Sequence, residues 1–167
     1  MAEALDGVKV VELAQWVFVP VAGALLADWG ADVVRVDRPE GDPYRGLRTQ
    51  GIGADSTGVN LSVALASRGK RSIALDVRTG AGGRVLHELI GGADVLLTSL
   101  RPGALARLGL GADEVRARYP SLVYARGHGY GVRSPDAGMP GYDASASVIL
   151  RSASWQASWS PSSAATI

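Results

Sequence analysis

Residues 8–38, VKVVELAQWVFVPVAGALLADWGADVVRVDR, contain the pattern that decides the fold. The β-branched run Val8–Leu13 predicts a strand. The apolar run Val21–Trp29 predicts a helix, and Pro20 before it suits a first helical turn. A glycine ends this helix, and Val33–Arg38 predicts a second strand. Two strands joined by a helix form a parallel βαβ unit with a right-handed crossover.

The same alternation of strands and helices continues along the chain. Further strands are predicted at Ser72–Val77, Val95–Thr98 and Leu122–Arg126, and further helices at Ala81–Ile90 and Ala112–Tyr119. This order predicts an α/β fold, namely a Rossmann-like open, mostly parallel sheet with helices on both faces. Sheets of this kind bind ligands at the carboxyl ends of their strands, so the loops that follow the strands are expected to hold the site.

Composition narrows the classes of function. The chain of 167 residues is 47% apolar and carries a net charge of +1, which is typical of a globular domain and argues against nucleic-acid binding. It has no cysteine, so thiolate metal sites and disulfides are excluded, and no metal is expected. The start, MAEALDGVKVVEL, shows no targeting signal, and no apolar run is long enough to span a membrane. We therefore expect a cytoplasmic protein without a membrane partner.

The character of the sequence changes near its end. Residues 144–167 carry a single charge, Arg151, and are rich in serine and alanine without clear periodicity. We therefore expect residues 1–147 to form the Rossmann-like domain and residues 148–167 to form an atypical, poorly ordered tail.

A nicotinamide-binding site is one candidate, because Asp37 ends the second predicted strand where a dinucleotide-binding fold places its ribose-binding acid. Two features disfavour it. The turn 15–20 after the first strand contains no glycine, although a pyrophosphate there needs small residues. The glycine run 80–83 lacks the last glycine of the fingerprint, since Val85 stands in its place.

An anion site is a second candidate, because several basic side chains fall in or near loops at the predicted strand ends. These residues are Arg38, Lys70, Arg71, Arg78, Arg101 and Arg107. Guanidinium groups bind phosphate through paired hydrogen bonds, although a single surface arginine is more often solvated or ion-paired.

Two glycine-containing motifs near the end of the predicted sheet are further candidates for ligand contact. In Gly127–Gly131 alternating glycines allow a ligand to come close to the backbone, and His128 is a possible proton carrier or donor. Gly141–Asp143 joins a glycine, an aromatic residue and an acid, and is uninformative alone.

Six segments of the sequence, taken in order, resemble a known protein family more specifically than any one of them does alone. They are LDGVKVVEL, LLADWGADVVRVDRPEGD, GKRSIALDVRTGAG, ADVLLTSLRPGALARLGLG, LVYARGHGYG and PGYD. Over about residues 5–147 the chain resembles the amino-terminal portion of class III CoA-transferases, also called the CaiB/BaiF family. The resemblance implies a Rossmann-like domain that binds coenzyme A, and a homodimer of interlocked chains in the full-length family.

The resemblance also implies which residues bind coenzyme A. It places the adenine and ribose near Arg38, Leu75 and Arg78. The residues that it places near the phosphates and pantetheine are Trp16, Val17, Ser99, Leu100 and Arg107, and His128 and Tyr130 would line the route to the thioester. Ser99 and Leu100 depart from the Asn-Phe pair frequent in the family.

The function implied is transfer of CoA between an acyl-CoA and a carboxylic acid, through an anhydride on an aspartate. That aspartate is expected beyond Ile167, so we assign no catalytic residue and expect a truncated form that retains mainly CoA binding. Two alternatives remain open: a 2-methylacyl-CoA racemase-like enzyme, and a nonenzymatic CoA-binding or split-subunit module. Tyr142 stands where the racemase branch commonly has histidine, which favours the transferase because a phenol is a poor base near neutral pH.

Overall fold

The computed structural model describes residues 3–50, 60–127, 129–130, 135–136 and 138–141. The chain divides into two compact units, Met1–His128 and Gly129–Ile167. The tail expected at residues 148–167 lies outside the described residues. The first unit holds the sheet.

Five strands of the described part form one parallel sheet in the order β3-β2-β1-β4-β5. Their bounds are β1 (Lys9–Leu13), β2 (Asp32–Asp37), β3 (Arg71–Ala74), β4 (Val95–Thr98) and β5 (Val123–Arg126). β1 lies in the centre, with Val11 opposite Val34 on one side and Leu96 on the other. The fold class predicted from the alternating pattern is therefore confirmed.

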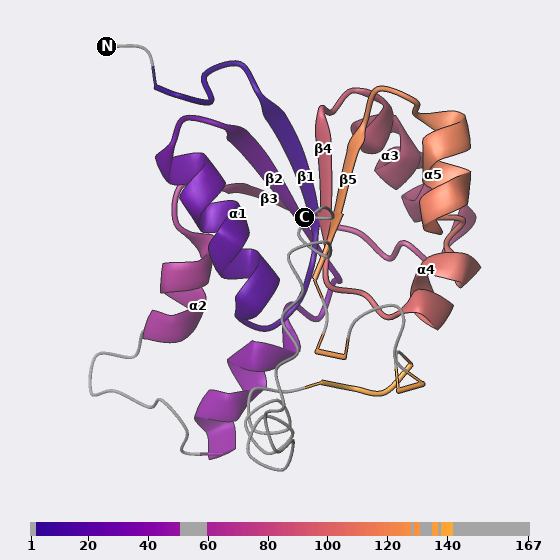
Figure 1. Cartoon of the computed structure of the whole chain (residues 1–167). Helices are drawn as coiled ribbons and strands as arrows, with labels where there is room; N and C mark the ends of the chain where they lie inside the picture. The colour runs from indigo at the N-terminus through magenta and orange to yellow at the C-terminus, as the bar shows by residue number, and fades with distance from the viewer. Residues whose placement is uncertain (1–2, 51–59, 128, 131–134, 137, 142–167) are drawn as a thin grey trace, which may run out of the picture. The chain divides into compact units, whose positions relative to one another are not determined.

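Helices cover both faces of this sheet (Figure 1). One face holds α1 (Phe18–Asp28) and, packed against it, α2 (Leu61–Ser67). The other face holds α3 (Gly80–Gly91), α4 (Pro102–Arg107) and α5 (Ala112–Arg118). A 3₁₀ helix, η1 (Pro43–Gln50), follows β2. The first two connections, after β1 and β2, thus lie on one face, and the next two, after β3 and β4, lie on the other.

Alternate residues of β1 serve the two cores, as the two-residue period of a strand requires. Val10 packs with the α1 residue Val19, whereas Val11 packs with Leu86 and Ile90 of α3. Each of these side chains is at most 3% exposed. Because helices cover both faces, the interior positions of the central strands β1 and β2 are mostly apolar, and a buried charged residue there stands out.

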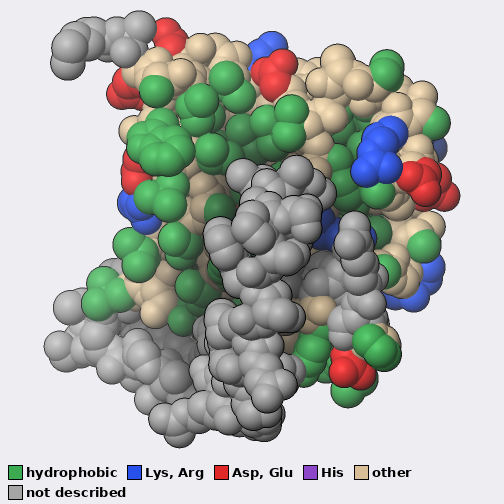
Figure 2. Space-filling model, in the orientation of Figure 1, with side chains coloured by type: hydrophobic (Ala, Val, Ile, Leu, Met, Phe, Trp, Pro, Cys, Tyr) green, Lys and Arg blue, Asp and Glu red, His purple; other side chains and the backbone are tan. Residues whose placement is uncertain are grey.

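The face formed by α1 and α2 leaves several large apolar side chains exposed, and Figure 2 shows hydrophobic side chains gathered there. They are Phe18, Leu25, Trp29, Leu61 and Leu65. Among the described residues, none of the helices combines the length and the apolar character that crossing a bilayer requires.

Candidate functional site

A cavity of about 150 Å³ lies at the carboxyl ends of the strands. Residues 13–15 come from the end of β1, 36–38 from the end of β2, 75–78 from the loop after β3, and Leu100 from the loop after β4. We call this cavity the strand-end pocket. Its position is the one predicted from the parallel topology, because β1 is the strand from which the chain order departs in both directions.

Four of the residues that the sequence proposed for CoA binding line the strand-end pocket: Arg38, Leu75, Arg78 and Leu100. Leu75 and Leu100 are half-buried, whereas Arg38 and Arg78 are exposed. The pocket thus combines apolar side chains with two guanidinium groups that solvent can reach. Such a surface suits a ligand with both a flat apolar part and negative charge.

Asp76 holds Arg78 in a two-pronged ion pair at the pocket. Arg78 Nε donates to Asp76 Oδ1 at 2.8 Å and Arg78 Nη2 donates to Oδ2 at 3.0 Å. Hydrogen bonds from Arg78 lower the pKa of Asp76, so the carboxylate stays ionised at neutral pH. An anion that binds Arg78 must therefore share it with Asp76.

Trp16 and Val17 lie in the loop between β1 and α1, and Ser99 lies in the loop after β4; none of the three is part of the pocket lining. The Ser99 hydroxyl accepts the backbone N–H of Gln15 at 2.9 Å. The Trp16 N–H donates to both carboxylate oxygens of Asp42, at 3.1 and 3.3 Å. Trp16 has a φ of 69°, in the left-handed region that favours glycine.

Three predicted residues remain: Arg107, His128 and Tyr130. Arg107 is exposed at the end of α4 and is absent from the lining. Tyr130 belongs to the second compact unit, and His128 lies outside the described residues.

Two of the proposed anion-site cations lie at the amino end of a strand: Lys70 precedes β3 and Arg71 is its first residue. Arg71 Nη2 lies 2.5 Å from Asp32 Oδ2 at the start of β2. The Lys70 side chain is only 1% exposed and pairs with Glu12. The prediction that Lys70 belongs to a solvent-facing anion site is therefore wrong, because its ammonium group is buried against a carboxylate.

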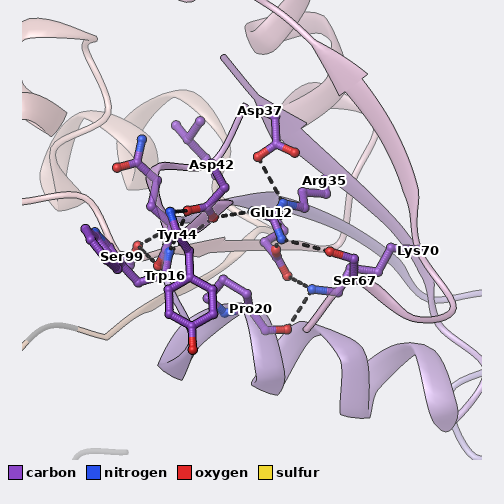
Figure 3. Close-up of polar contacts among 12 residues, drawn as sticks. Glu12, Trp16, Pro20, Arg35, Asp37, Asp42, Tyr44, Ser67, Lys70 and Ser99 are labelled. Carbon is purple, nitrogen blue, oxygen red and sulfur yellow. Dashed lines mark hydrogen bonds and ion pairs between the residues drawn. The ribbon is translucent and has the colours of Figure 1, made fainter. Parts of the chain in front are cut away.

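Charged side chains form a buried cluster that sequence reasoning missed. The buried charge cluster comprises Glu12, Arg35, Asp37, Asp42 and Lys70 (Figure 3). Lys70 Nζ donates to Glu12 Oε2 at 2.5 Å and to the Pro20 carbonyl at 2.6 Å. Arg35 donates to Asp37 at 3.0 Å through Nε and to Asp42 through Nη2.

Burial shapes the protonation of this cluster. Loss of solvent raises the pKa of Glu12 to about 7, although Lys70 and Arg35 partly oppose the rise. The same burial lowers the pKa of Lys70. Within the part of the chain that the structure describes, Glu12 Oε1 has no hydrogen-bond partner, and Arg35 Nε is 3.9 Å away. Burial of the Glu12–Lys70 ion pair therefore costs free energy, and the charge on Glu12 changes with pH near neutrality.

Stability is expected to depend on pH through Glu12. Its pKa in the folded protein, about 7, exceeds its ordinary value of 4.5, so between these values the folded state binds more protons than the unfolded state. The stabilisation is fully present below pH 4.5 and is lost as pH rises through 7. Urea unfolding from pH 5 to 8 should show the wild type losing stability relative to Glu12→Gln, by at most about 1.4 kcal/mol per pH unit. The exposed Glu88→Gln is the control, and parallel curves for wild type and Glu12→Gln would contradict the prediction.

Within the second unit, Gly129 from the first glycine-containing motif lies against Gly141 from the second. A Cβ on Gly129 would lie 2.8 Å from the Cα of Gly141, and a Cβ on Gly141 would lie 2.8 Å from the Cα of Gly129. The two backbones therefore approach too closely for any side chain. The Tyr130 ring lies beside the same contact, with its Cε2 3.4 Å from a Cβ built on Gly141.

Comparison with known proteins gives consistent matches. The profile of the CoA-transferase family III matches residues 5–158. A cinnamoyl-CoA:phenyllactate CoA-transferase of Clostridium sporogenes is 39% identical over 138 residues, which cover 83% of this chain and 34% of that protein. An (R)-2-hydroxy-4-methylpentanoate CoA-transferase of Clostridioides difficile is 33% identical, over 83% of this chain and 35% of that protein.

Solved structures agree. A hypothetical protein of Mycobacterium tuberculosis, Rv3272, superposes with a TM-score of 0.78 at 33% identity, over 96% of this chain and 43% of that one. The chain spans about a third of the length of the curated relatives that it matches.

Proposed function

The chain belongs to the CoA-transferase family III, and on this premise we propose that its strand-end pocket binds the nucleotide end of coenzyme A in an enzyme that moves CoA between an acyl-CoA and a carboxylic acid. The observation that carries the proposal is the meeting of Arg38, Leu75, Arg78 and Leu100, from three different loops, in one pocket.

The chemistry of the pocket fits one end of such a ligand. Coenzyme A is a polyanion with an adenine ring, and arginines bind phosphates through paired donors and stack on flat rings. The cavity of about 150 Å³ is smaller than the usual range for a whole small-molecule site, so it would hold only part of one end of the ligand and leave the rest outside. Binding the remote end of a substrate allows that energy to be used at the reacting thioester.

The remaining contacts are assigned by the same proposal. Arg38, Leu75 and Arg78 would hold the adenine and ribose. The residues assigned to the phosphates and pantetheine are Trp16, Val17, Ser99, Leu100 and Arg107, and His128 and Tyr130 would border the thioester. The names of the two clostridial relatives describe transfer of CoA to or from carboxylic acids, which supports the same reaction class here. We propose a homodimer for the full-length enzyme.

Calorimetric titration with CoA tests the proposal. Arg38→Ala and Arg78→Ala should each weaken binding by roughly 10- to 100-fold, because a hydrogen bond to a charged group contributes about 1.5–3 kcal/mol. Arg116→Ala should leave it unchanged, since Arg116 is 70% exposed on α5 and pairs with Asp113. Affinity should also fall as salt rises. Absence of heat with millimolar CoA and folded protein would reject the proposal. Full transferase activity of the purified chain by itself, without a partner, would exclude the alternative of a nonenzymatic or split-subunit module.

A further inference from the structure

The turn between β1 and α1 is where sheets of this type commonly hold a phosphate, because free backbone N–H groups and the start of a helix face the ligand there. In this chain two of those N–H groups are already used. Gln15 N–H donates to the Ser99 hydroxyl, and Trp16 N–H donates to the Asp42 carboxylate. The chain therefore supplies its own anion at this turn.

Asp42 cannot readily leave this position. Its side chain is 1% exposed, and Arg35, itself 3% exposed, contacts Oδ2 through Nη2. Oδ1 also accepts the Tyr44 N–H at 2.8 Å. Arg35 is anchored in turn, since its Nη1 donates to the Ser67 hydroxyl at 3.2 Å and its Nε to Asp37. One carboxylate thus joins β2, the start of η1 and the β1–α1 loop (Figure 3).

The backbone at Trp16 shows what this anchoring does. A φ of 69° is unfavourable for a bulky residue and persists only where the surroundings enforce it, at a typical cost of about 1–3 kcal/mol. The two hydrogen bonds from the Trp16 N–H to Asp42 hold Trp16 in this conformation. The preceding residue, Gln15, lines the strand-end pocket together with Ala14. Relaxation of Trp16 would therefore move a wall of the pocket.

From this geometry we propose that Asp42 is a positioning residue: its carboxylate takes the place of a ligand phosphate at the β1–α1 turn and fixes the loop that forms one wall of the strand-end pocket. The ligand named for that pocket rests on the proposed function. Asp42 does not line the pocket, so its effect on binding passes through its neighbours: through Trp16 to Gln15, and through Arg35 to Asp37. The arrangement also removes the amides that a dinucleotide's pyrophosphate would need at this turn.

The test compares Asp42→Asn and Asp42→Gly with the exposed Asp113→Asn, whose carboxylate is 99% exposed. Asp42→Asn keeps the shape but turns an amide toward Arg35, so CoA affinity should fall about 10-fold, equivalent to about 1.4 kcal/mol. In Asp42→Gly, sodium formate at tens of millimolar should restore the affinity, because formate offers the same donors a carboxylate. Sodium chloride at equal ionic strength should not. Asp113→Asn should bind as the wild type does.

Amide hydrogen exchange tests the role of Asp42 without CoA, and so independently of the proposed function. The Trp16 N–H should exchange slowly in the wild type, quickly in Asp42→Gly, and slowly again with formate. If the wild type fails to bind CoA, the proposed function fails while exchange still tests the loop. Fast exchange of the Trp16 N–H in the wild type, which needs no variant to fold, would overturn the role of Asp42. Unchanged CoA affinity in a folded Asp42→Asn protein would overturn it as well.

Discussion

Replacing Lys70 by methionine is expected to lower the free energy of unfolding by about 3–5 kcal/mol at pH 8, the usual cost of removing one partner of a buried ion pair. Lys70 is the residue that donates to Glu12 Oε2 and to the Pro20 carbonyl, and the Glu12 side chain is fully buried. Without the ammonium group, the carboxylate must either stay charged in an apolar interior or take up a proton. Urea denaturation measures the loss.

Three comparisons make the Lys70 result specific. Arg116→Met breaks the exposed pair with Asp113 and should cost less than about 0.5 kcal/mol. The loss in Lys70→Met should shrink at pH 5, where Glu12 is protonated. The double variant Glu12→Gln/Lys70→Met should recover part of the stability, because no buried charge is then left alone. A loss below about 1 kcal/mol for Lys70→Met at pH 8 would show that the pair is not enclosed as described.

Gly23→Ala is expected to cost about 3 kcal/mol, in spite of the better helix propensity of alanine. Gly23 lies in α1 directly over the Glu12–Lys70 pair. A Cβ there would come 1.8 Å from Glu12 Oε2 and 3.0 Å from Lys70 Nζ. Neither group can move aside, since both side chains are at most 1% exposed. The melting temperature should therefore fall by several degrees.

Gly103→Ala is the matched control for that substitution. Gly103 is an exposed helical glycine in α4, and a Cβ there meets nothing closer than Arg107 Nη1 at 3.7 Å. The Gly103→Ala protein should gain up to about 1 kcal/mol in free energy of unfolding from helix propensity alone. If the Gly23→Ala protein were as stable as the wild type, the Glu12–Lys70 pair would not be packed against α1 as closely as described.

The elements that local periodicity reveals were predicted well. The strand predicted at Val95–Thr98 is observed with the same bounds, and the helix predicted at Ala81–Ile90 is observed as Gly80–Gly91. The short helices α2 and α4, of seven and six residues, were not predicted, because a helix of less than two turns shows little period. The equally short α5 was predicted, and its acidic first turn and basic last turn are the end signals that α2 lacks.

One strand was predicted too long for a reason that concerns the site. The prediction ran through Ser72–Val77, but β3 ends at Ala74. Asp76 bends the chain instead, because its carbonyl accepts the Thr79 hydroxyl at 2.8 Å and Thr79 caps α3. The β-branched pattern could not show this turn, which forms part of the pocket wall.

The buried charge cluster was missed because its members are far apart in sequence. Glu12 and Lys70 are separated by 58 residues, and nothing local indicates that they meet. A signal was nevertheless present. Glu12 and Arg35 each interrupt a strand that is otherwise apolar, and the register places them side by side on β1 and β2. Charges within strands covered on both faces demand partners.

Because β1 lies in the centre of the sheet, it lacks one of its two neighbours during much of translation. β1 leaves the ribosome first, but its neighbour β4 lies 85 residues further on, as the bond from the Thr98 hydroxyl to the Leu13 carbonyl shows. Until residue 98 has been translated, one side of β1 offers unpaired amides and apolar side chains to other nascent chains. Slower synthesis of residues 40–95 should therefore prolong this exposure and increase the yield of aggregated product.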